Sequence, residues 1–111
     1  MTQDRSLRDI GPDKTLLLVD DDEPFLRRLE RAMEKRGFVV EAAETVAAGK
    51  AIAIARPPAY AVVDLRLEDG NGLDVVETLR AKRPDCRIVV LTGYGAIATA
   101  VAAVKIGATD Y

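Results

Sequence analysis

Four acidic residues stand in a row directly after the apolar residues 16–19: Asp20, Asp21, Asp22 and Glu23. Two unit charges about 4 Å apart repel each other by roughly 4 kcal/mol at an effective dielectric constant near 20. A chain that crowds carboxylates in this way needs something to offset the repulsion. A bound divalent cation and the amides at the start of a helix are two simple means of doing so.

Apolar runs and helical patterns alternate along the chain. Continuous apolar runs at 15–20, 59–64 and 87–92 are typical of parallel strands covered on both faces. A more amphipathic run at 38–42 predicts a strand nearer an edge of the sheet. This alternation predicts an α/β domain with a doubly wound parallel sheet and right-handed crossovers.

Four helical patterns follow these strands and complete the alternation. Their apolar positions at helical spacing are Leu26, Leu29, Met33, Leu73, Val76, Leu79, Ile97, Val101 and Val104. Their predicted boundaries are Asp22 or Glu23 to Gly37, Thr45 to Arg56, an end before Pro84 for the third, and an end at Gly107 for the fourth.

Polar side chains fall at the predicted carboxyl ends of the strands, where ligands gather in sheets of this kind. Asp20 and Asp21 end the first strand, Asp64 ends the third and Thr92 ends the fourth. Three carboxylates at adjacent strand ends form a hard oxygen cluster suited to Mg²⁺. Helix capping explains the acidic residues 22–23 more simply, but it does not explain Asp64, which lies in a different connection.

Four separated motifs, VDDDEP, VVDLRLEDGNG, VVLTGYG and GATDY, resemble the receiver domain of bacterial two-component response regulators. The segments DLRLEDGNGL and LTGYGAIATAVAAVKIGATDY further resemble the redox-responsive global regulators of the RegA, PrrA and ActR type. The resemblance covers nearly the whole chain after residue 14. It implies a flavodoxin-like, five-stranded parallel sheet of order 2-1-3-4-5.

The resemblance assigns a role to each acidic residue of the cluster. It makes Asp64 the phosphoacceptor, with Asp20, Asp21, Asp64 and the backbone carbonyl of Arg66 as the ligands of Mg²⁺. It also implies a sensor histidine kinase as the partner that donates the phosphoryl group. The absence of histidine from this chain fits that scheme, because the partner supplies the imidazole.

A switch is also implied by the resemblance. Thr92 would hydrogen-bond the phosphoryl group, and Tyr111 would be the aromatic residue whose rotamer follows phosphorylation. The surface that changes would lie around the fourth helix and the fifth strand. Between Ala96 and Ala108 that helix has Lys105 as its only charge, so a homodimer through this face is a further hypothesis.

The predicted organisation is a polar leader at 1–14 followed by a receiver domain at 15–111. The active-site lysine of the family lies a few residues beyond GATDY, so we expect the fifth strand to be cut short and the fifth helix to be missing. The resemblance further implies a C-terminal helix-turn-helix effector domain. DNA binding would therefore belong to residues outside this sequence.

Composition excludes several other classes of protein. The 111 residues include 16 basic and 18 acidic side chains, so the net charge of −2 gives no reason to bind nucleic acid or an anionic membrane directly. No stretch is apolar enough to span a bilayer. Cys86 is the only cysteine, which excludes an internal disulfide and favours a cytoplasmic location; a redox role for it is a minor hypothesis.

Three rival functions remain open to test. Asp20 and Asp22 resemble the nucleophile and acid of haloacid-dehalogenase-type phosphatases, but this hypothesis leaves Asp64 unexplained. A pseudo-receiver that no longer takes phosphate is a second alternative, against which the complete acidic set argues. The glycine pattern at 93–98 fits a dinucleotide fingerprint only in outline, because it follows the fourth strand and not the first.

Overall fold

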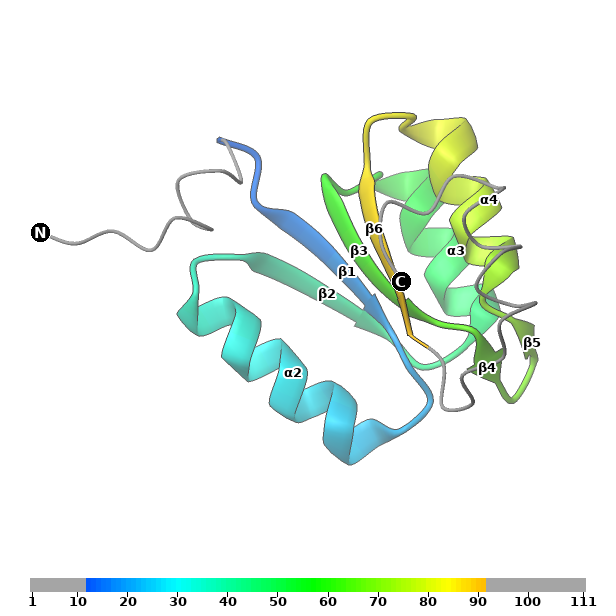
Figure 1. Cartoon of the computed structure of the whole chain (residues 1–111), viewed down its shortest axis with the longest axis horizontal. Helices are drawn as coiled ribbons and strands as arrows, with labels where there is room; N and C mark the ends of the chain where they lie inside the picture. The colour runs from blue at the N-terminus through cyan, green and yellow to red at the C-terminus, as the bar shows by residue number, and fades with distance from the viewer. Residues whose placement is uncertain (1–11, 92–111) are drawn as a thin grey trace, which may run out of the picture.

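The structure of the protein, a computed structural model, describes residues 12–91 (Figure 1). Its strands are β1 (Thr15–Val19), β2 (Val39–Ala43), β3 (Tyr60–Asp64), β4 (Arg66–Leu67), β5 (Gly70–Asn71) and β6 (Arg87–Leu91). Its helices are α2 (Glu23–Lys35), α3 (Val46–Ala55) and α4 (Leu73–Lys82). None of these described helices is both long enough and apolar enough to cross a bilayer.

The main sheet has the strand order β2-β1-β3-β6, and all its neighbouring strands are parallel. This confirms the doubly wound α/β fold and agrees with the first four strands of the predicted order 2-1-3-4-5. The register pairs Val19 with Val63 across β1 and β3, and Asp64 with Leu91 across β3 and β6. The carboxyl ends of the strands therefore lie side by side, which places the residues after β1 next to Asp64. The predicted fifth strand lies outside the described residues.

Local capping explains where α2 and α3 begin and end. The side chain of Asp22 accepts a hydrogen bond from the amide of Phe25 at 3.1 Å, and that of Thr45 accepts one from the amide of Ala48 at 3.0 Å. Gly37 has a φ of 96°, a left-handed conformation that glycine adopts readily and that ends α2. The boundaries predicted for these two helices are confirmed.

Helices cover the sheet unequally (Figure 1). On one face α3 and α4 pack over the larger apolar core; on the other, α2 packs on β1 and β2 through Leu26 with Leu29 and Met33. The larger core consists of Leu17, Val19, Ala43, Val46, Ala53, Ala61, Val63, Leu65, Leu67, Val75, Val76, Leu79, Cys86, Ile88 and Val90. The helical stripes predicted for α2 and α4 are therefore confirmed.

Strand β6 differs from the expectation of a strand covered on both faces. Its burial alternates, with Ile88 and Val90 buried but Arg87 exposed and Val89 36% exposed. The physical reason is the position of α2, which lies over β1 and β2 and leaves the same face of β6 without a helix in the described part of the chain. By contrast, β1 is buried from Leu16 onward, as predicted.

A short antiparallel hairpin between β3 and α4 was not predicted from the sequence. Arg66 pairs with Asn71, and Leu67 pairs with Gly70. Leu65 and Leu67 turn inward to the larger core, while Arg66 and the residues at the tip are exposed. The polar, glycine-containing segment 68–72 thus lies in an ordered hairpin that starts at Arg66, two residues after Asp64.

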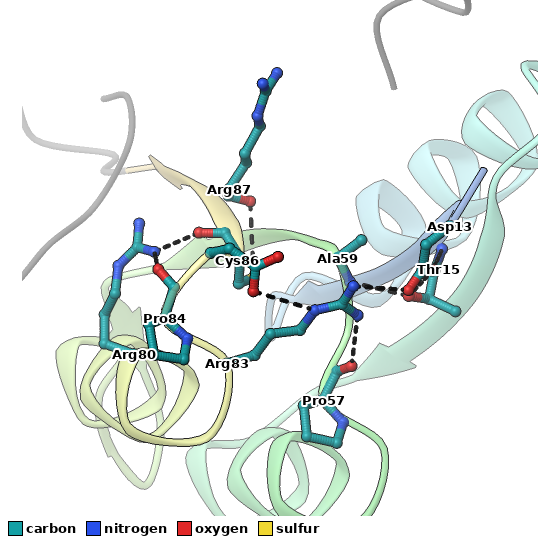
Figure 2. A network of polar contacts seen from close by, with 10 residues as sticks. Asp13, Thr15, Pro57, Ala59, Arg80, Arg83, Pro84, Cys86 and Arg87 are labelled. Carbon is teal, nitrogen blue, oxygen red and sulfur yellow. Dashed lines mark hydrogen bonds and ion pairs between the residues drawn. The ribbon is translucent and has the colours of Figure 1, made fainter. Parts of the chain in front are cut away.

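A polar network ties together the loops at the amino ends of the strands (Figure 2). Arg83, just after α4, forms an ion pair with Asp13 at 2.8 Å and donates a hydrogen bond to the carbonyl of Pro57 at 3.1 Å. Asp13 also accepts a hydrogen bond from the hydroxyl of Thr15 at 2.7 Å. The hydroxyl in turn accepts one from the amide of Ala59 at 2.9 Å. Hydrogen bonds from Thr15, together with Arg83, lower the pKa of Asp13 to about 2.

This lowered pKa makes Asp13 a pH-dependent source of stability. A carboxylate whose folded pKa lies below its ordinary value of 3.8 stabilises the fold above pH 4, and the effect is lost as the pH falls toward 2. We expect Asp13→Asn to lower the free energy of unfolding at pH 7 by about 1 kcal/mol, since solvent screens a partly exposed ion pair. Urea unfolding between pH 7 and pH 3 should show the difference shrinking at the acid end. Asp85→Asn is the control, because Asp85 is 82% exposed and lies 3.6 Å from the same arginine; an equal loss in both variants would contradict the prediction.

Candidate metal centre

Three carboxylates meet at the carboxyl ends of β1 and β3. Asp20 and Asp21 follow β1, and Asp64 is the last residue of β3. Each offers one oxygen, and these oxygens all lie within 4.8 Å of one another. Because β1 and β3 are parallel neighbours, the convergence follows directly from the register of the sheet.

Asp20 is the most deeply placed of the three, with 7% of its surface exposed. Its amide donates a hydrogen bond to the carbonyl of Ala43 at 3.0 Å, and its carboxylate accepts one from the amide of Asp22 at 2.9 Å. Burial raises the pKa of Asp20, and the negative charges of Asp64 and Asp21 raise it further. The backbone thus fixes this carboxylate in a position that is unfavourable for its charge.

Asp64 is half-buried and also has a raised pKa. Burial is the main cause, with the charge of Asp21 adding to it, and a hydrogen bond from the amide of Arg66 at 3.1 Å opposing it. Two carboxyls with raised pKa values beside a third carboxylate form a site that attracts positive charge. The donor set consists of carboxylate oxygens, which fits a hard divalent cation.

The remaining acidic residues of the opening run have a different role. Asp22 is the N-cap of α2, and Glu23 lies in its first turn, where negative charge complements the helix dipole. The helix-capping interpretation is therefore confirmed for these two residues. The run of four acids divides into a pair at the cluster and a pair at the helix.

Gly72 contributes to the site through its lack of a side chain, a feature that the sequence did not reveal. Its amide donates a hydrogen bond to the carbonyl of Leu65 at 2.9 Å, and an added Cβ would lie 2.0 Å from the carbonyl oxygen of Asp64. Any side chain at this position would push the loop away from the cluster. The run of polar and glycine residues indicated a turn, but the close approach to Asp64 depends on the tertiary fold.

Several predicted site residues lie outside the described residues. These are Thr92, Tyr111 and the fourth helix with Lys105. Arg66 is described: it opens β4 and its amide contacts Asp64. That the backbone carbonyl of Arg66 is a ligand of Mg²⁺ remains a prediction.

The family profile of the response regulator receiver domain matches residues 16–111. The chain belongs to this family. It is 84% identical over 103 residues to the photosynthetic apparatus regulatory protein RegA of Cereibacter sphaeroides, covering 93% of this chain and 56% of RegA. It is 69% identical over 102 residues to the acid tolerance regulatory protein ActR of Rhizobium meliloti, covering 92% of this chain and 53% of ActR. The chain therefore spans about half the length of these curated relatives.

A solved structure supports the same placement. A response regulator from Burkholderia pseudomallei, crystallised with a phosphorylated aspartic acid, a calcium ion and citrate, matches with a TM-score of 0.85 and 43% sequence identity. The match covers 89% of this chain and 58% of that one. The protein is thus a receiver domain of the kind found in RegA and ActR, and not a conventional enzyme. Membership of this family argues against the haloacid-dehalogenase hypothesis.

Cys86 lies apart from the acidic cluster, in the larger core next to the network of Figure 2. It is 1% exposed, and burial raises the pKa of its thiol to about 11. The thiolate is the reactive form of cysteine, so these surroundings disfavour redox chemistry at Cys86.

We expect Cys86 in the native receiver domain to resist alkylation by iodoacetamide at pH 8, because less than about 1% of a thiol with a pKa near 11 is ionised there. Intact mass should show modification only after denaturant is added. Rapid labelling of the native protein would mean that the thiol is accessible and would contradict the burial described above.

The raised pKa of Asp20 makes the stability of the receiver domain depend on pH in the direction opposite to that given by Asp13. A carboxyl whose folded pKa exceeds its ordinary value of 3.8 destabilises the fold as the pH rises through that folded pKa. In buffer with a chelator, Asp20→Asn should raise the free energy of unfolding at pH 7 by about 1 kcal/mol, with a smaller gain near pH 4. Glu68→Gln, an equal change of charge in the loop after β3, is the control. A destabilised Asp20→Asn protein at pH 7 would refute the claim that burial and the neighbouring charges make the ionised form of Asp20 unfavourable in the fold.

Proposed function

We propose that this receiver domain accepts a phosphoryl group from a sensor histidine kinase on Asp64, in a reaction that depends on Mg²⁺. One observation carries the proposal: Asp64 comes from a different connection than Asp20 and Asp21, yet its carboxylate lies within 4.8 Å of theirs. A helix cap does not require this arrangement, whereas a site for a metal ion and a phosphoryl group does.

Exposure separates the roles of the carboxylates. Asp20 is buried, so a protein partner cannot readily reach it, which suits a metal ligand. Asp64 is half-buried at the strand end, where a phosphorylated imidazole of a partner can approach it. This difference supports Asp64 as the nucleophile and disfavours Asp20, the residue that the phosphatase hypothesis would use.

In the proposed reaction an oxygen of Asp64 attacks the phosphorus of the kinase phosphohistidine. A phosphorus–oxygen bond forms as the phosphorus–nitrogen bond breaks, and the imidazole of the kinase leaves. Asp20, Asp21, Asp64 and the carbonyl of Arg66 would hold the metal. Bound Mg²⁺ would neutralise charge on the phosphoryl oxygens, and the remaining contribution of the protein is to position the reacting groups.

The proposed switch involves Thr92 and Tyr111. Thr92 directly follows Leu91, which pairs with Asp64 in the sheet and whose carbonyl accepts a hydrogen bond from the amide of Leu65 at 3.0 Å. Because Leu91 lies beside Asp64, we propose that the hydroxyl of the next residue in the sequence, Thr92, hydrogen-bonds the phosphoryl group. Tyr111 would follow this movement and change the surface of the fourth helix and fifth strand, through which two copies would associate.

The output of this switch would be transcriptional. RegA and ActR are named as regulatory proteins, and this chain covers little more than half of each. A DNA-binding domain beyond the receiver domain would supply contact with DNA, and the reaction would take place in the cytoplasm.

Phosphorylation by acetyl phosphate tests the proposal directly. With Mg²⁺ present, intact mass should show one added phosphoryl group on the full-length protein, and none on Asp64→Asn. Glu68→Gln should behave like the wild type, since it removes a charge near the site but outside the cluster. Chelation should abolish labelling of the wild type.

The rival hypotheses predict different results. A pseudo-receiver would take no phosphoryl group under any condition. Labelling that persists in Asp64→Asn and disappears in Asp20→Asn would instead identify Asp20 as the nucleophile.

A further inference from the structure

We propose that Asp69 is a positioning residue for the phosphorylation loop, defined as residues 64–72. Its carboxylate binds the tip of this loop to the amino end of α3. This contact holds the backbone of Arg66 in place for the metal. The inference rests on the proposed function, because it concerns the same metal site.

The contact between the loop and α3 is well defined. One oxygen of Asp69 accepts a hydrogen bond from the amide of Val46 at 2.7 Å, and the other accepts one from the amide of Ala47 at 3.1 Å. These pairs are 23 and 22 positions apart in the sequence. Gly70 adds to the contact, since a Cβ built on it would lie 3.6 Å from the side chain of Val46.

The amides at the start of α3 divide their hydrogen bonds between two side chains. The first amides of a helix lack partners within the helix. The side chain of the local N-cap, Thr45, accepts from the amide of Ala48, and the carboxylate of Asp69 accepts from the amides of Val46 and Ala47. The amides of Val46 and Ala47 also lower the pKa of Asp69, so it is ionised at neutral pH and its charge complements the helix dipole.

The phosphorylation loop is consequently held at both ends. At its base, the amide of Leu65 donates to Leu91 and that of Gly72 donates to Leu65. At its tip, Asp69 lies in the turn between Leu67 and Gly70, the last pair of the hairpin. Between the base and the tip, the side chain of Leu67 is buried in the larger core. The contact of Asp69 with α3 adds an attachment at the exposed tip, beyond Leu67.

Arg66 lies between these two attachments. Its side chain is exposed, and its amide contacts Asp64 at 3.1 Å. The backbone at this position therefore has to be placed by its neighbours and not by burial of its own side chain. Fixing the tip at α3 limits the hinge motion of the hairpin and hence the range of positions open to the carbonyl of Arg66.

The test compares two adjacent charge removals in the full-length protein. Asp69→Asn keeps one acceptor oxygen but loses the charge and one hydrogen bond to α3. Glu68→Gln is the matched control, because Glu68 occupies the other position of the same turn and is also exposed. Magnesium affinity is measured at pH 7 by NMR titration of amide resonances, and thermal stability is measured on the same samples.

We expect Asp69→Asn to weaken magnesium binding about tenfold, the low end of the effect of losing an outer-shell partner. Glu68→Gln should change the affinity by no more than about twofold, as is usual for surface substitutions. In the wild type, magnesium should also slow hydrogen exchange at the amides of Val46 and Ala47, a readout that does not depend on whether a variant folds well.

The outcomes separate this inference from the proposed function. Loss of thermal stability in Asp69→Asn with unchanged magnesium affinity, or unchanged exchange at α3 on magnesium binding, would show that Asp69 is only a helix cap and would overturn the inference. If the wild type itself bound no magnesium, the proposed function would fail together with the inference.

Discussion

Repulsion among three carboxylates at the ends of parallel strands is the constraint on which the rest of this structure depends. The register of β1 and β3 forces Asp64 toward Asp20 and Asp21, and the sheet cannot relieve the repulsion without breaking its ladder. Burial is the main cause of the raised pKa values of Asp20 and Asp64, and the charges of the neighbouring carboxylates add to it. The protein therefore keeps a locally unfavourable group of carboxylates in a fold that is otherwise apolar and well paired, a pattern typical of functional sites.

Asp64 and Asp69 are only a few residues apart, yet their local environments shift their pKa values in opposite directions. Asp69 receives two backbone amides at the start of α3, which lower its pKa, whereas Asp64 loses water to burial and faces the charge of Asp21, which raise its pKa. Both belong to the same short loop after β3. Residues 64–72 thus combine one carboxylate, Asp69, whose ionised form is favoured by backbone amides, with another, Asp64, whose ionised form is disfavoured by burial.

The sequence predicted much of this arrangement for physical reasons that act locally. Apolar runs and caps such as Thr45 and Asp22 located the strands and helices, and parallel strand ends brought Asp20 and Asp64 to one edge. The contact of Asp69 with α3 could not be predicted, because it joins residues 22 and 23 positions apart and depends on how α3 packs beside the hairpin. The exposed face of β6 was also missed, since a continuous apolar run does not show which helix covers it.

Charged side chains are arranged differently at the two ends of the sheet, and this difference suits the proposed conformational switch. At the amino ends, Arg83 joins Asp13 and the loop of Pro57 into a network in which charge is paired and the pKa of Asp13 is lowered (Figure 2). At the carboxyl ends of β1 and β3, by contrast, the carboxylates of Asp20, Asp21 and Asp64 are gathered within 4.8 Å of one another. A change of charge at the carboxyl edge alters the balance of forces there, while the amino edge has its own independent attachments. On the proposed phosphorylation, conformational change would therefore concentrate in the loops around Asp64, while the network at the amino ends would stay in place.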